Sequence, residues 1–248
     1  MIIFFVILTS LSFASFGNNI ISFFTNNSEP EINRSLCFCG KKKLSILELI
    51  PVLSFLFQKG KCKTCNQKIP LRYLITEITF GLIGLAIYLK YGLTIKFIII
   101  FLSLFILTII GMIDYSSFRI PNKLLFALIP LVLINILYLP EDTLLNLILT
   151  VSLLLLLILL NSLFLKLKNK EVIGYGDIKL IGLLSVLFGF PLLFFGLWLS
   201  ALLGLIGYSI NKNIWNERVP FGFFIWIGFV LTELFGESIL SSYLELIS

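Results

Sequence analysis

Apolar runs of membrane-spanning length recur along this chain of 248 residues and restrict its fold more than any other feature. Hydrophobic residues make up 58% of the sequence and charged residues only 13%. A soluble domain, in contrast, carries about 25% charged residues. Because a helix crosses the hydrocarbon core of a bilayer with about 20 apolar residues, this pattern predicts an all-α, polytopic integral membrane protein.

The expected helices follow the apolar runs. Residues 178–210 are too long for one crossing, and Gly189-Phe190-Pro191 should divide them, because glycine and proline interrupt helices. No basic segment precedes residues 2–24, so we interpret this run as a retained helix and not as a cleaved signal peptide. We expect eight transmembrane helices, with seven as the alternative. The spans are residues 2–24, 73–89, 94–113, 123–139, 143–165, the two parts of 178–210, and 221–240.

Lysine and arginine indicate the orientation of these helices, because they concentrate in the cytoplasmic loops of membrane proteins. If the N-terminus lies outside, four segments face the cytoplasm and hold 17 of the 19 basic residues. Topology then accounts for the net charge of +6, and no nucleic-acid partner is expected. The cytoplasmic segments are residues 25–72, 114–123, 166–179 and 211–219. We divide the chain into a first helix, 1–24, a cytoplasmic loop domain, 25–72, and a membrane domain, 73–248.

Two aspartates, Asp114 and Asp177, lie at the cytoplasmic ends of different expected helices. The chain has no histidine, so acid–base chemistry must use other groups, such as carboxylates. Two carboxylates that lie close together share a proton, and one can activate water while the other protonates a carbonyl or a leaving amine. Two simpler interpretations stay open. Asp177 is a favoured residue type for the N-cap of a helix starting at Ile178, and Asp114 can be an ordinary interfacial residue.

Two glycines, Gly174 and Gly176, precede Asp177 in the sequence GYGD. Because glycine has no side chain, an extended peptide can approach the carboxylate there and pair with the open backbone. We therefore expect both glycines to contribute to substrate binding, and Lys179 to set the local charge.

The polar loop contains four cysteines in two pairs, Cys37, Cys39, Cys62 and Cys65. In a reducing compartment, two closely spaced pairs are more typical of a structural zinc site than of disulfides. Zinc bound by all four thiolates would hold together a small zinc-ribbon-like insertion that has no core of its own. The alternative is four free thiols.

Several motifs together resemble one family. The sequence GYGDIKL matches the GxGD motif of intramembrane-type aspartyl proteases, and IDYSSFRIPN lies upstream of it. With ASFGNNIISF and ELIPVLSFLFQKGKCKTCNQKIPLRY, these motifs are similar to the bacterial type IV prepilin peptidases over most of residues 14–182. The first cysteine pair departs from the family pattern CxxC, because Cys37-Phe38-Cys39 is one residue short and Gly40 stands where the second cysteine is expected.

The resemblance implies an aspartic endopeptidase with Asp114 and Asp177 as its catalytic residues. Such an enzyme removes the basic leader from type IV prepilins or pseudopilins at the cytoplasmic face of the bacterial inner membrane. Many members also methylate the new N-terminus with S-adenosylmethionine, an activity associated with the cysteine-bearing region. No separate signature of a methyl-donor pocket is present in the sequence.

Two glutamates are candidates for recognition of the basic leader, because the lysine-rich loop itself would repel such a peptide. These are Glu48 and Glu77. A carboxylate inside a membrane helix is costly without a partner. The alternative for Glu77 is therefore a structural pair with Arg72 or Tyr73.

Other classes of protein explain these features less completely than a peptidase does. A small transporter or proton-coupled channel would use the aspartates as relay groups, but it would place them near the middle of the membrane. A zinc-dependent scaffold that binds a partner leaves the aspartate motifs unexplained. An archaeal preflagellin peptidase shares the aspartates, but its family lacks the cysteine loop. The sequence does not indicate an oligomeric state.

Overall fold

The computed structural model describes residues 1–25, 50–62, 66–138, 143–168, 173–215 and 219–247. These residues form two compact units, Met1–Leu93 and Thr94–Ser248. Over the described ranges the regular structure is helical, apart from one isolated antiparallel bridge between Lys61 and Lys68. The all-α prediction is therefore confirmed.

The first unit is built on two long helices that pack along each other, α1 (Ile2–Thr25) and α3 (Leu71–Tyr91), with the short α2 (Leu53–Phe57) between them in sequence. The helices approach closely at Gly81, where an added Cβ would lie 2.9 Å from the Leu11 side chain. The buried positions of α1 recur every three or four residues, as expected for a helix with one packed face. They are Val6, Ser10, Ala14, Gly17, Asn18 and Ile21.

The core of the second unit surrounds α4 (Ile95–Ser117), which packs against α5 (Asn122–Tyr138) and α9 (Phe221–Leu231). Gly111 permits the contact with α9, because an added Cβ there would lie 2.8 Å from Cβ of Trp226. The last apolar run continues from α9 through a π-helical turn, Thr232–Gly236, into α10 (Glu237–Ile247).

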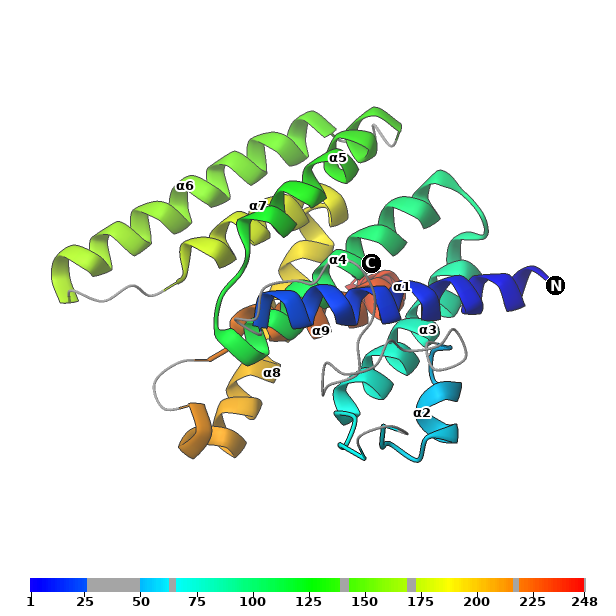
Figure 1. The fold of residues 1–248 in the computed structure, drawn as a ribbon. Coiled ribbons are helices and arrows are strands. Elements are labelled where there is room, and N and C mark those ends of the chain that lie inside the picture. The colour runs from blue at the N-terminus through cyan, green and yellow to red at the C-terminus, as the bar shows by residue number, and fades with distance from the viewer. Residues whose placement is uncertain (26–49, 63–65, 139–142, 169–172, 216–218, 248) are drawn as a thin grey trace. The chain divides into compact units, whose positions relative to one another are not determined.

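Figure 1 shows α5, α6 (Thr143–Lys168) and α7 (Tyr175–Phe188) side by side, with α7 packed against both neighbours. A buried hydrogen bond of 2.8 Å joins the hydroxyl groups of Thr150 and Ser185 between α6 and α7. Gly189 separates α7 from α8 (Phe190–Trp215) with a positive φ of 74°. The expected break in residues 178–210 is thus present.

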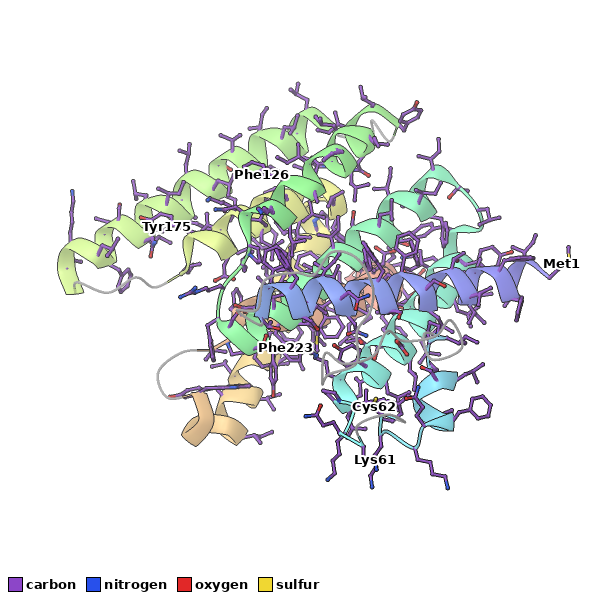
Figure 2. All side chains as sticks on the ribbon, in the orientation of Figure 1. Met1, Lys61, Cys62, Phe126, Tyr175 and Phe223 are labelled. Atoms are coloured by element: carbon purple, nitrogen blue, oxygen red, sulfur yellow. The ribbon has the colours of Figure 1, made fainter. Side chains whose placement is uncertain are left out.

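The helix lengths agree with a polytopic membrane protein. Within the described ranges, six helices are long and apolar enough to cross a membrane. Helix α5 has 17 residues and α7 only 14, or about 21 Å for α7 against a hydrocarbon core of about 30 Å. Eight separate crossings therefore stay a prediction. Many apolar side chains are exposed on the helices, such as Phe126 in Figure 2, as expected for surfaces that contact lipid.

Two helix ends differ from the sequence prediction. Helix α4 continues past residue 113 to Ser117, so Asp114 lies inside the helix and not in the following loop. Phe118 ends α4 in the left-handed conformation, and its N–H donates to the Asp114 carbonyl over 2.8 Å. Helix α7 begins at Tyr175 and not at Ile178, with Gly174 as the N-cap. Glycine and aspartate are both good N-cap residues, so the motif GYGD alone did not define the start.

Candidate active site

Asp114 lies in the last turn of α4, with only 6% of its surface exposed. The backbone N–H groups of Gly222 and Phe223, at the start of α9, interact with its carboxylate. The ring of Phe223 also lies 4.9 Å from that of Tyr115, measured between the centroids. The carboxylate oxygen Oδ2 has no hydrogen-bond partner among the residues that the structure describes. Burial without a full set of partners is unusual for a carboxylate, and it marks Asp114 as more than an interfacial residue.

Asp177 is the third residue of α7 and is half-buried. Asp177 is not the N-cap of α7, so the alternative in which it only caps a helix starting at Ile178 is wrong. Its carboxyl lies close enough to Asp114 for the charge of one to act on the other. The second unit therefore brings together two aspartates that lie on different helices and are 63 positions apart in sequence. Two close carboxylates repel each other when both are ionised, and this is the arrangement in which one proton is shared.

The two glycines of the GYGD motif have different surroundings. Gly174 is exposed, and an added Cβ would lie 3.0 Å from Oδ2 of Asp177. Gly176 faces the side chain of Ile120, whose Cβ would lie 3.1 Å from an added Cβ. Gly174 thus leaves space beside the carboxylate, whereas Gly176 allows the first turn of α7 to pack against the segment that precedes α5.

Lys179 is exposed, and its Nζ donates a hydrogen bond of 3.2 Å to Oδ1 of Asn122. Asn122 is the first residue of α5, so this bond connects the starts of α5 and α7. The sequence analysis did not assign a role to Asn122, although the segment IPN contains it. The signal that could have identified Asn122 is its polar side chain, which directly follows Ile-Pro at the start of an apolar helix.

Glu77 belongs to the first unit, where only 7% of its surface is exposed. Its Oε2 accepts a hydrogen bond of 2.6 Å from the backbone N–H of Val52, and it also bonds the side chain of Ser15. The structural alternative for Glu77, a pair with Arg72 or Tyr73, is wrong about the partner. Both of those side chains bond Ser22 instead, over 3.2 Å and 2.8 Å. Glu77 thus bonds the backbone directly before α2, whereas Arg72 and Tyr73 bond Ser22 on α1.

Of the predicted zinc ligands the structure describes only Cys62, which is buried. Its N–H donates to the Gln67 carbonyl and its carbonyl accepts from the Asn66 N–H, each over 2.9 Å. With the Lys61–Lys68 bridge, these bonds pair residues 61–62 with residues 66–68, and Figure 2 labels Lys61 and Cys62. Backbone pairing between the residues on the two sides of a CxxC sequence suits the two-thiolate half of a zinc ribbon. The other expected ligands, Cys37, Cys39 and Cys65, lie outside the described residues, as does Glu48.

The described part of the chain contains no group of three or more metal-ligating side chains. Because three of the four cysteines fall outside it, the zinc site stays a prediction.

Comparison with known families gives two adjoining matches. Residues 8–91 match the bacterial peptidase A24 N-terminal domain, and residues 99–209 match the type IV leader peptidase family. The second match includes Asp114 and Asp177, the two aspartates of the site. No solved structure matches the chain.

Curated relatives agree with these families, and the ones compared here are each named prepilin leader peptidase/N-methyltransferase. The protein from Bacillus subtilis is 31% identical over 220 residues, which cover 86% of each chain. The protein from Pseudomonas putida is 28% identical over 84% of this chain and 74% of its own. The protein from Vibrio cholerae is 31% identical over 80% of each chain. The transporter alternative finds no support in these matches, and the chain belongs to the type IV leader peptidase family.

Proposed function

We propose that Asp114 and Asp177 are the catalytic dyad of this leader peptidase and that its substrates are prepilins or pseudopilins. The observation that carries the proposal is the approach of two carboxylates from different helices of one compact unit. The names of the curated relatives support the class of substrate. Exposed Gly174, beside Asp177, leaves the approach of an extended peptide open.

The reaction is hydrolysis of one peptide bond by a water molecule held between the two carboxyl groups. The ionised aspartate takes a proton from the water as the water oxygen attacks the carbonyl carbon. The protonated aspartate gives its proton to the carbonyl oxygen, which forms a neutral tetrahedral intermediate. The carbon–nitrogen bond then breaks, and the leaving amine takes the proton that came from water. The second proton returns from the collapsing intermediate to the dyad.

Recognition of the leader is proposed for the first unit and its loop. Glu48 is placed there by sequence as a carboxylate available to a basic leader. Glu77 is buried and bonded to Val52, which supports a role in fixing residue 52 and not in direct contact with the leader. Lys179 is exposed near the start of α7. Its positive charge there repels a basic peptide and attracts the carboxylates near Lys179.

The proposed cofactors belong to the same region of the chain. A structural zinc ion held by Cys37, Cys39, Cys62 and Cys65 would fix the loop, and the backbone bonds of Cys62 with Asn66 and Gln67 support this. S-adenosylmethionine would supply the methyl group if the chain shares the second activity in its relatives' names. The proposed location is the bacterial inner membrane, with the N-terminus outside and the dyad at the cytoplasmic face, because the basic segments then lie inside.

The test uses the full-length protein in detergent or liposomes with a prepilin that carries a Gly-Phe junction. Wild type should release the leader, whereas Asp114→Asn and Asp177→Asn should each reduce cleavage by at least about 10²–10⁴-fold, because an amide cannot exchange the proton. Mass spectrometry of the products separates loss of the leader from addition of a methyl group. Full cleavage by either folded single variant would contradict the shared dyad.

A further inference from the structure

We propose that Gly222 is a positioning residue for Asp114, because only a glycine at the start of α9 lets that helix hold the carboxylate in its working orientation. The inference rests on the proposed function for its catalytic meaning, but the contact itself can be tested without activity. Sequence analysis assigned no role to Gly222. Its position directly after Pro220-Phe221, at the start of an apolar helix, was the available signal.

The space around Gly222 is filled by Asp114. A Cβ added to Gly222 would lie 3.0 Å from Oδ2, 3.2 Å from Cγ and 3.3 Å from Cβ of Asp114, and these are its three nearest heavy atoms. Distances this short are uncommon for a real methyl group. A side chain at position 222 would therefore press on the whole length of the aspartate side chain.

The glycine also brings two backbone donors to the carboxylate. Helix α9 begins after the N-cap Pro220, so Gly222 and Phe223 lie in its first turn. The N–H groups of a first turn have no carbonyl four residues before them within the helix, and they favour an anion. Both N–H groups interact with Asp114, and that of Phe223 also reaches the Pro220 carbonyl over 3.2 Å.

A second observation shows that the carboxylate is held for a purpose beyond capping the helix. Asp114 is more than nine-tenths buried, yet its Oδ2 has no hydrogen-bond partner within the described residues. A buried acceptor without a partner is costly. The arrangement therefore holds the side chain in place and leaves the acceptor capacity of one oxygen unused, as a carboxylate that must bond a reacting group requires.

Asp114 has little freedom to adapt to a larger residue at position 222, because α4 and α9 are locked together one turn away. At Gly111 an added Cβ would lie 2.8 Å from Cβ of Trp226 and 3.4 Å from Cα of Phe223. The helices cannot separate without losing this packing. The aspartate must instead rotate, which moves its oxygens away from the reacting water.

The experiment compares Gly222→Ala with Gly204→Ala in the full-length protein. Gly204 is a matched control on α8, since its added Cβ would also face α9 but at 3.6 Å from the Phe224 ring, an ordinary contact. Misplacement of a catalytic group by about 1 Å costs about 10²-fold. We expect Gly222→Ala to lower kcat for prepilin cleavage by about 100-fold with KM within about twofold, and Gly204→Ala to change neither.

Stability provides a second readout that does not depend on catalysis. Gly222→Ala should lower the thermal midpoint of wild type, but by much less in an Asp114→Ala background, where the pressed carboxylate is absent. Equal losses in both backgrounds, or wild-type kcat in folded Gly222→Ala, would overturn the positioning role. If wild type cleaves no prepilin although the two positions are coupled in stability, the proposed function fails while the contact between Gly222 and Asp114 stands.

Discussion

The bond between Glu77 and the Val52 N–H allows a quantitative prediction about the first unit. Val52 has a φ of 62°, which is unusual for a β-branched residue and costs on the order of 1–3 kcal/mol. Its neighbours close a tight turn, in which the Leu53 N–H donates to the Pro51 carbonyl over 2.6 Å. The 2.6 Å bond to the buried Glu77 carboxylate holds this conformation. We expect Glu77→Ala to release it.

The expected loss of protection follows from the strength of the hydrogen bond between Glu77 and the Val52 N–H. A hydrogen bond to a charged group contributes about 1.5–3 kcal/mol and a neutral one about 0.5–1.5 kcal/mol. Glu77→Gln keeps an acceptor oxygen and loses about 1 kcal/mol, whereas Glu77→Ala loses the whole bond, about 1.5–3 kcal/mol, because the strain at Val52 is released on local opening in wild type and variant alike. Since about 1.4 kcal/mol corresponds to tenfold, protection of the Val52 amide from hydrogen exchange should fall roughly fivefold in the first variant and about 10- to 100-fold in the second.

The assay is hydrogen exchange of the purified protein, read on peptides that contain residue 52. The amide of Ile178, in the other unit, serves as the internal control and should keep its protection in both variants. Unchanged protection at Val52 in Glu77→Ala would refute the reasoning. If Glu77 instead served leader binding alone, KM for prepilin would rise while exchange at residue 52 stayed at the wild-type rate.

Two further predictions concern packing and the metal. Gly176→Ala should destabilise the second unit by about 1–3 kcal/mol, because its Cβ would lie 3.1 Å from Cβ of Ile120, and Ile120→Gly, which removes that Cβ, should relieve part of this loss, as a double-mutant cycle in thermal unfolding would report. Additive losses would exclude the contact. Metal analysis should find about one zinc ion per chain in wild type and far less in Cys62→Ser, since structural zinc needs four ligands. A metal content that is unaffected by the substitution would exclude Cys62 as a ligand.

Local sequence patterns predicted the helices well, because crossing a bilayer fixes their length and polarity. The break at Gly189 was also visible, since glycine and proline adjoin there. The approach of Asp114 and Asp177 was inferred only as a requirement of their chemistry, because no local pattern encodes a contact between distant helices.

Partners that depend on tertiary structure were predicted less well. Glu77 bonds a backbone N–H 25 positions earlier, which no side-chain pattern indicates, so the structural alternative of a pair with Arg72 or Tyr73 named the wrong partner. Gly222 escaped notice for a related reason. Its importance comes from the aspartate that faces it, and a glycine in an apolar run has many possible explanations.

The short length of α7 has a consequence for how a substrate reaches the dyad. A helix that rises about 21 Å cannot place both of its ends at the two surfaces of a hydrocarbon layer of about 30 Å. If its Gly189 end is level with the outer head groups, Asp177 lies within the hydrocarbon layer and does not reach the inner head groups. Alternatively, the bilayer is locally thinner around α7. Hydrophobic mismatch of this kind would let water reach the carboxylates from the nearer side of the membrane. It would also allow a pilin that is still embedded in the bilayer to be cut at its exit from the lipid.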